Sequence, residues 1–256
     1  MVIRRWEHEV FDILPQERRA NIDIVSSAYS SVLGDKAYLS MPITSGKRYY
    51  EILDHYGVKT VEELEKKIPG ALREEIIIPN IDDGKKFAER LAPELDSSLI
   101  VPAIFEARRQ RWTQEEYMVL WLRLLTKSVK EIYLLDGWEY SNGGAIEFAR
   151  GLMIRYRFIE ERNDRLLIYD HKKRPVSIEE GARKLTEAIK DLTRRGHQTS
   201  TLRKELGRVA GIAAYCNDYL TSRDKWAYHA NGIGLNSGAT ITAAKSVGAM
   251  IALTRD

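Results

Sequence analysis

The sequence predicts an α/β protein with a doubly wound, mostly parallel sheet of five strands and extra helices at both ends of the chain. Short apolar runs alternate with stretches of helical periodicity between residues 35 and 195. Polar turns that contain glycine follow two of the apolar runs. The chain has 256 residues, of which 44% are hydrophobic, so it can build one large core with an appendage.

The predicted strands are short apolar runs bounded by polar or turn-forming residues. The first run precedes the turn-like segment from Met41 to Gly46. Such runs are typical of strands that are covered on both faces of a parallel sheet. The expected strands are residues 36–39, 75–78, 98–104, 131–135 and 166–169, with residues 157–160 as a hairpin partner or edge segment.

The predicted helices are marked by their ends and by apolar residues three or four positions apart. Thr60 and Thr113 each begin a capping-box pattern, with a glutamate three residues later. Gly57 and Gly196 are placed as helix ends. The expected helices are residues 47–57, a short helix after Thr60, and residues 83–95, 114–128, 143–154, 177–195 and 200–222, with a small-residue helix after Ser237.

These elements divide the chain into three regions. Residues 1–34 are expected to form a helical extension that Pro15 interrupts. Residues 35–195 carry the alternating strands and helices of the α/β domain. Residues 196–256 differ in pattern and are expected to form a helical appendage that packs on the core or on a second subunit.

Composition argues against several classes of function. The net charge of +3, from 40 basic and 37 acidic residues, is too balanced to predict nucleic-acid binding. The single cysteine, Cys216, excludes a disulfide framework, and the dispersed histidines show no metal-binding spacing. We find no signal-peptide pattern and no run of about 18 apolar residues, so we expect a cytoplasmic protein without a membrane span, metal or cofactor.

The most informative motif runs from Leu134 to Glu147. It predicts the end of a buried strand, a polar loop with Gly143 and Gly144, and the start of a helix. Ligands of open α/β sheets bind at the carboxyl ends of the strands, and free N–H groups at a helix start bind anions. Glu147 would lie about one turn into the helix, where a carboxylate can attack an electrophilic sugar carbon. The same pattern also fits an ordinary helix cap with an acid favoured by the helix dipole.

A second strand-to-helix motif runs from Tyr38 to Arg48. Ser45, Gly46, Lys47 and Arg48 could bind phosphate, although the spacing is not that of a P-loop. A basic, solvated helix start explains the same residues equally well.

The two motifs resemble the nucleoside 2-deoxyribosyltransferase-like superfamily, which includes N-deoxyribosyltransferases and nucleoside 5′-monophosphate N-glycosidases. Tyr38 to Pro42 is similar to the first-strand motif of the family, and Leu134 to Glu147 is similar to its strand–loop–helix signature. The resemblance covers about residues 35–195. It implies a Rossmann-like or flavodoxin-like fold and a homo-oligomer in which neighbouring subunits complete the site.

The resemblance also implies roles for individual residues. Glu147 matches the nucleophile that attacks the anomeric carbon, expels the base and forms a glycosyl-enzyme intermediate. Ser141 matches a position at the 5′ end of the sugar, and Arg48 loosely matches a basic residue of the phosphate-binding branch. The implied substrate-binding residues are Tyr38, Met41, Arg48, Asp136, Trp138, Ser141 and Gly143.

One departure from the family concerns the helix before the signature strand. The family usually places an aspartate there, whereas residues 119–123 of this chain include no acid. Glu116 is the nearest substitute and is the second candidate catalytic residue. Loss of acid assistance lowers a rate by roughly 10²–10⁴-fold.

Three functions therefore remain open. The leading expectation is an N-glycosidase or deoxyribosyltransferase that cleaves the N-glycosidic bond of a nucleotide or nucleoside through Glu147. A non-catalytic nucleotide-binding or sensing module is the alternative that the absent aspartate favours. A related glycosidase acting on NAD or a modified base would use the same glutamate.

Overall fold

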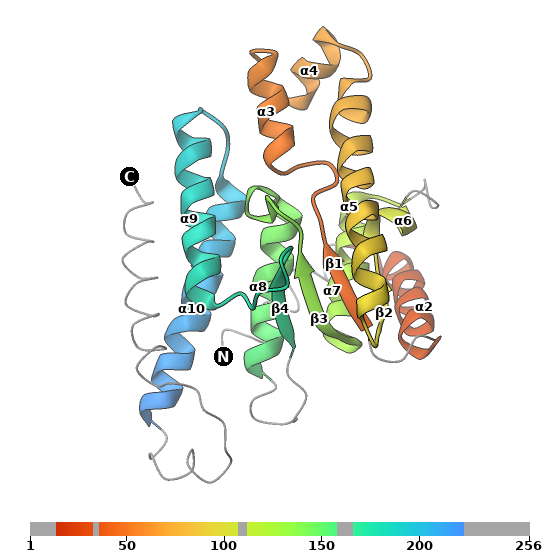
Figure 1. Cartoon of the computed structure of the whole chain (residues 1–256), viewed down its shortest axis with the longest axis vertical. Coiled ribbons are helices and arrows are strands. Elements are labelled where there is room, and N and C mark those ends of the chain that lie inside the picture. Colours follow the sequence, from red (N-terminus) through yellow and green to blue (C-terminus); the bar gives the residue numbers. More distant parts are fainter. Residues whose placement is uncertain (1–13, 33–35, 107–111, 158–165, 223–256) are drawn as a thin grey trace. The chain divides into compact units, whose positions relative to one another are not determined.

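The computed structural model describes residues 14–32, 36–106, 112–157 and 166–222. Its strands form one parallel sheet with the order β2-β1-β3-β4 (Figure 1). The strands are β1 (Lys36–Ser40), β2 (Ser98–Ile100), β3 (Val129–Leu134) and β4 (Leu167–Asp170). The chain divides into two compact units, Met1–Pro175 and Val176–Asp256, and the sheet belongs to the first.

The prediction of a five-stranded sheet was wrong, because the described residues form four strands. The strand expected at residues 75–78 is helical: η1 (Leu72–Ile77) is a π-helix that continues into α5 (Ile78–Leu91). A short apolar run does not by itself distinguish a strand from a buried helix. Ile76 packs in a small hydrophobic cluster with Leu53, Leu64 and Ala71, and this burial stabilises the helical conformation of the segment.

Two other strand predictions also needed correction. The strand expected at residues 98–104 ends at Ile100, because α6 (Pro102–Glu106) begins at a proline, which favours the first turn of a helix. Arg157 is the last residue of a helix rather than part of a strand, and residues 158–160 lie outside the described residues.

Most helix predictions were confirmed. Thr60 and Thr113 are the N-caps of their helices, and Thr113 forms a complete capping box with Glu116. The helix expected at residues 83–95 begins earlier, as α5, and ends in the short 3-10 helix η2 (Ala92–Glu94). The helix after Ser237 lies outside the described residues. The remaining helices are α2 (Gln16–Val32), α3 (Lys47–His55), α4 (Val61–Lys67), α7 (Gln114–Lys127), η3 (Trp138–Tyr140), α8 (Asn142–Arg157), α9 (Ile178–Arg194) and α10 (Ser200–Ser222).

Helices cover both faces of the sheet, so the fold is doubly wound. Ala37 and Leu39 of β1 face α5 and pack in one core cluster with Phe87 and Leu91. Tyr38 lies between them on the strand and therefore faces the opposite side, where its ring meets Trp121 of α7. Helix α8 lies on this second side and contacts β3 and β4 (Figure 1).

The strand order creates a switch point between β1 and β3. The chain leaves β1 toward β2 through α5 and later returns through α7 to place β3 on the other side of β1. Ligands of doubly wound folds bind at such points, beyond the carboxyl ends of the strands. A hydrogen bond of 2.9 Å from Leu135 N to Ser40 O holds the two strand ends together.

The predicted N-terminal extension is represented by α2, which packs on α7. Arg18 forms an ion pair of 3.0 Å with Glu116, and the hydroxyls of Ser30 and Ser128 lie 3.4 Å apart. The buried Lys36 donates to the carbonyl of Ser30 and so caps the carboxyl-terminal turns of α2. These contacts place α2 in the same compact unit as the sheet.

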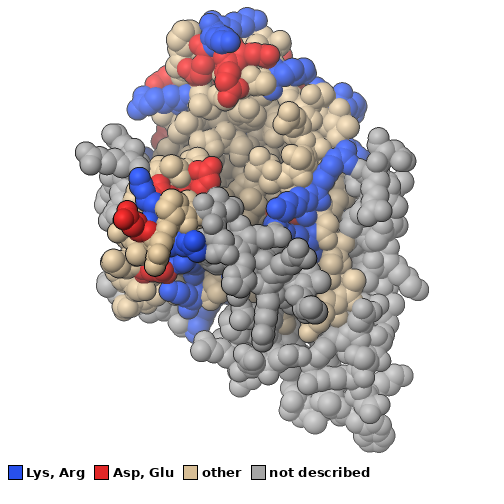
Figure 2. Space-filling view, turned by 180° about the vertical axis from the view of Figure 1, so that it is seen from behind, with Lys and Arg blue, Asp and Glu red and all other residues tan. Residues whose placement is uncertain are grey.

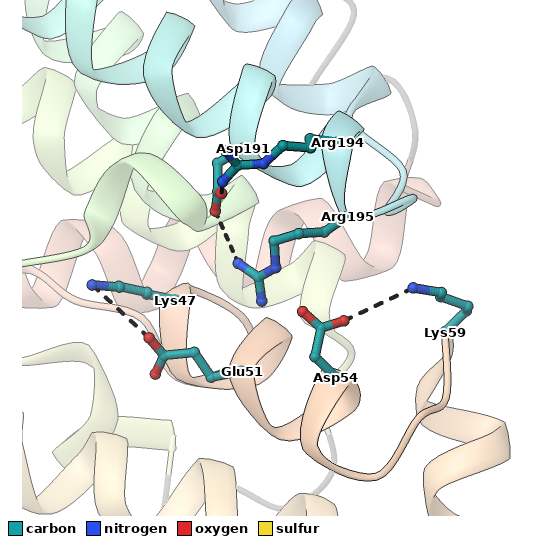
Figure 3. Close-up of polar contacts among 7 residues, drawn as sticks. All are labelled: Lys47, Glu51, Asp54, Lys59, Asp191, Arg194 and Arg195. Carbon is teal, nitrogen blue, oxygen red and sulfur yellow. Dashed lines mark hydrogen bonds and ion pairs between the residues drawn. The ribbon is translucent and has the colours of Figure 1, made fainter.

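The second unit contains α9 and α10, which pack against each other. Ser177 caps α9, and at its other end Asp191 binds both Arg194 and Arg195 (Figure 3). The predicted domain boundary at residue 195 lies between these helices, whereas the chain divides into its two compact units after Pro175. None of the helices in the described residues has the length and apolar content needed to cross a bilayer.

Candidate functional site

A buried carboxylate lies beside the switch point. Glu147 is in the second turn of α8, and only 6% of its surface is exposed. The hydroxyl of Tyr38 donates a hydrogen bond of 2.5 Å to Glu147 Oε1. Tyr38 is itself fully buried on β1. The fold therefore brings together two predicted site residues that are 109 positions apart in the chain.

An aromatic group from α7 supports this pair. The ring of Trp121 lies 6.3 Å from the ring of Tyr38, and Tyr117 stacks on Trp121 at 6.4 Å. Tyr117 and Trp121 are both buried. Trp121 belongs to the stretch of α7 in which the family resemblance leads one to expect an aspartate. At this point α7 contributes rings that pack against the tyrosine, and the tyrosine in turn binds Glu147.

Glu116, the second candidate catalytic residue, has the contacts of a capping acid. Its Oε2 accepts a hydrogen bond of 2.6 Å from Thr113 N, and its Oε1 accepts one of 3.0 Å from Arg18. These contacts account for its burial, with 3% of its surface exposed. Glu116 therefore has a structural role: it caps the start of α7 and binds α2 through Arg18.

Two serines meet at the starts of α3 and α8. The hydroxyls of Ser45 and Ser141 share a hydrogen bond of 3.0 Å. Ser141 Oγ also accepts from Gly144 N at 3.3 Å and so caps α8. The N-cap of α3 is Gly46, which provides no side-chain cap. Two positive helix ends thus converge on one pair of hydroxyls, an arrangement that suits an anion.

The loop between β3 and α8 is shaped by local turn chemistry. Gly137 has a φ of 78°, a left-handed conformation that favours glycine, and η3 follows it. Trp138 is buried, with its ring 4.6 Å from that of Phe148 on α8. A Cβ at Gly144 would lie 2.7 Å from Trp138 O, so this glycine allows α8 to approach the loop. Trp138 was predicted to bind substrate, and in the structure its ring packs on α8.

Two predicted residues of the first strand-to-helix motif face α5. Arg48 donates to Asn80 Oδ1 at 2.5 Å and to Asp83 Oδ2 at 2.8 Å. Met41 lies in the core cluster, and its thioether occupies the space that a side chain at Gly84 would fill. The structure thus directs Arg48 and Met41 toward α5, whereas Ser45 of the same loop reaches Ser141.

The remaining predicted residues lie at the rim. The side chain of Asp136 is 74% exposed and lies 3.7 Å from Nδ1 of His171, which follows β4. Gly143 is half-buried in the first turn of α8. Sequence reasoning assigned no role to His171 or Asn80, because neither belongs to a motif and both lie more than 30 residues from their partners in the chain.

Two buried polar atoms beside the switch point have no hydrogen-bond partner among the described residues. They are Ser40 Oγ and Trp138 Nε1. Ser40 ends β1 and Trp138 follows β3, so both flank the switch point. The described part of the chain contains no group of three or more His, Cys, Asp or Glu side chains that could hold a metal ion.

Charge on the surface is mixed. In the face drawn in Figure 2, basic and acidic side chains form small groups that are separated by uncharged surface. On α3, Lys47 and Glu51 form an exposed pair at 3.9 Å (Figure 3). Such exposed pairs contribute little to stability.

No family model, no curated protein and no solved structure matches this chain.

Proposed function

We propose that this protein cleaves the N-glycosidic bond of a nucleoside 5′-monophosphate, with Glu147 as the nucleophile. One observation carries the proposal. The buried carboxylate of Glu147 lies on α8 and accepts a hydrogen bond from Tyr38, and at the start of the same helix Ser141 meets Ser45. Glu147 lies six positions after Ser141, which corresponds to about 9 Å along a helix. That span is comparable to the length of a ribose 5-phosphate. The phosphate can therefore lie at Ser141 while the anomeric carbon lies at Glu147.

The chemistry follows from these positions. A carboxylate oxygen of Glu147 attacks the anomeric carbon, the bond to the base nitrogen breaks, and its electron pair leaves with the base. The base takes up a proton, and the sugar remains joined to Glu147 as an ester. Water then attacks the anomeric carbon, which releases the sugar phosphate and regenerates the carboxylate. A second base in place of water would make the reaction a transfer.

Tyr38 has a supporting role in this reaction. Its hydroxyl donates to Glu147, and hydrogen bonds to the charged form of a carboxylate favour that form. The contact also fixes the direction of one oxygen. Because the tyrosine lies on β1 and the glutamate on α8, the hydrogen bond joins the two sides of the switch point.

The two helix ends favour a nucleotide over a nucleoside. A 5′-phosphate can accept hydrogen bonds from the hydroxyls of Ser45 and Ser141 and from N–H groups at the starts of α3 and α8. A nucleoside has only a hydroxyl at this position. We therefore expect nucleoside monophosphates to bind more tightly than the matching nucleosides.

A non-catalytic nucleotide-binding module is the second candidate, and Trp121 is the observation that favours it. Trp121 packs against Tyr38 in the stretch of α7 in which the family resemblance implies an acid. Without that acid the leaving base lacks assistance, which can lower the rate by roughly 10²–10⁴-fold. Tight binding of an intact nucleotide without turnover would identify this function.

The test is a time course of base release from nucleosides, nucleoside monophosphates and NAD. We expect release from at least one monophosphate, and Glu147→Gln should reduce it by about 10³-fold or more. Glu89→Gln, on the exposed side of α5, is the matched control and should retain full activity. No release from any substrate, or full activity in Glu147→Gln, contradicts the proposal.

The intermediate and the assembly can be tested separately. Intact-mass measurement of a quenched reaction should show the protein with one added sugar phosphate, and Glu147→Gln should lack this species. The homo-oligomer that the resemblance implies is testable by light scattering, where a clean monomer at micromolar concentration would contradict it.

A further inference from the structure

Three residues on one face of α5 contact the loop that follows β1. Asp83 and Gly84 lie three and four positions after Asn80, so both neighbour it on the same side of the helix. Gly84 allows Met41 to pack at the start of the loop, and Asp83 binds Arg48 just after it. Asn80 lies one turn earlier on α5 and binds the middle of the loop.

Asn80 uses both ends of its amide. Its Nδ2 donates to Ile43 O at 2.9 Å and is 3.5 Å from Ser45 O. Its Oδ1 accepts from Arg48 at 2.5 Å. Only 7% of Asn80 is exposed, and hydrogen bonds weigh more where water is excluded. A carboxylate in this place could bind Arg48, but it would repel the two carbonyls, so the contact pattern requires an amide.

We propose that Asn80 is a positioning residue that sets the preference for a 5′-phosphate. By holding Ile43 O and Ser45 O, it fixes the backbone from which the Ser45 hydroxyl reaches Ser141. A loop that is already ordered binds its ligand without the entropic cost of ordering it. Arg48 then acts as a brace between the loop and α5, and its guanidinium is not a phosphate ligand. This inference rests on the proposed function, because it assumes that Ser45 and Ser141 receive a phosphate.

Four variants separate this role from a general loss of stability. Asn80→Asp keeps the volume and the acceptor for Arg48 but loses the donor to the carbonyls. Asn80→Ala loses both, and Asp83→Asn weakens only the contact with Arg48. Asp82→Asn is the matched control, because Asp82 is an exposed neighbour on the same helix.

The first measurement is amide hydrogen exchange in residues 41–48, which needs no ligand. Exchange should be faster in Asn80→Asp and Asn80→Ala than in the natural protein, intermediate in Asp83→Asn and unchanged in Asp82→Asn. Unchanged exchange in both Asn80 variants overturns the proposal. If Asn80→Ala does not fold, Asn80→Asp and Asp83→Asn provide the same comparison.

The second measurement is the affinity for a nucleoside monophosphate and for its nucleoside. Asn80→Asp and Asn80→Ala should bind the monophosphate about tenfold more weakly, as expected for a lost buried hydrogen bond, and the nucleoside within about twofold of the natural protein. An equal loss for both ligands, or no loss for either, overturns the proposal. If the natural protein binds neither the monophosphate nor inorganic phosphate, the proposed function fails together with the phosphate preference. Faster exchange in the variants would then still show that Asn80 orders the loop.

Discussion

The two strand-to-helix junctions at the switch point are built in different ways. The junction after β3, residues 135–141, is shaped by its own residues: Gly137 supplies the left-handed turn, and Ser141 caps the helix that follows. The junction after β1, residues 41–46, is held from outside by Asn80 of α5. They touch through the two hydroxyls of Ser45 and Ser141.

The two junctions differ in how much of their construction can be recognised from the sequence. A junction made of local turn and cap residues leaves a pattern that can be recognised in the chain. The turn of the first junction can also be recognised in the chain, but the residue that holds it, Asn80, lies more than 30 positions away and belongs to no motif. The proposed anion subsite needs both junctions, and the sequence shows both turns but not the contact that holds the first one.

The largest effect on stability is expected at Gly46. Its φ is 100°, and a Cβ there would lie 2.6 Å from the Cβ of Pro42. Gly46→Ala should lower the free energy of unfolding by about 3 kcal/mol, because backbone strain and overpacking add. Gly70, with a φ of 89° and open space around it, is the control, and Gly70→Ala should cost about 1 kcal/mol. Equal losses in urea unfolding would show that the first junction tolerates movement.

The next effect tests the connection between the two sides of the switch point. Tyr38→Phe removes the buried donor to Glu147 and should cost about 2 kcal/mol in urea unfolding. Tyr56→Phe makes the same chemical change at the partly buried hydrogen bond with Glu75 and should cost less. If both variants lose the same amount, the hydrogen bond between Tyr38 and Glu147 contributes no more to stability than the one between Tyr56 and Glu75.

A smaller effect compares the two serines. Ser141→Ala removes the cap of α8 and should cost about 1 kcal/mol, whereas Ser45→Ala should cost a few tenths, because Ser45 caps no helix. Thermal unfolding of the single variants measures both. A larger loss of stability for Ser45→Ala than for Ser141→Ala would contradict the view that only the second junction depends on its own cap residue.

The smallest effect concerns a third local turn, at the end of β4. Burial raises the pKa of Asp170, but the N–H groups of Arg174 and Lys172 and the Arg174 side chain lower it by more, so the net pKa lies below its usual value. This carboxylate therefore stabilises the fold above about pH 4, and the stabilisation is lost as pH falls through the lowered pKa.

Asp170→Asn should flatten the pH dependence of the unfolding midpoint below about pH 4, with a change of about 1 kcal/mol or less near neutral pH. The control is Asp96→Asn at an exposed position. An identical pH dependence in the natural protein and in Asp170→Asn would show that this turn is not held by its carboxylate.

Local patterns of the chain predicted much of the fold. The caps at Thr60 and Thr113 and the turn before Ser141 involve residues within a few positions of one another, so the sequence contains them complete. The run at residues 75–78 misled the prediction, because its apolar side chains satisfy a buried helix as well as a strand. Only packing against Leu53 and Leu64 distinguishes the two.

The features of the site also separate into short-range ones, which the sequence shows, and tertiary contacts, which it does not. The position of Glu147 after a strand, a glycine-containing loop and a helix start could be predicted from the chain, because each of these is a short-range property of the backbone. The binding of Tyr38 to Glu147, the capping role of Glu116 and the contact of Arg48 with Asn80 depend on tertiary packing. The physical reason is that buried polar groups must find partners, and the partners available in a packed interior are set by the crossing of strands and helices rather than by neighbours in the chain.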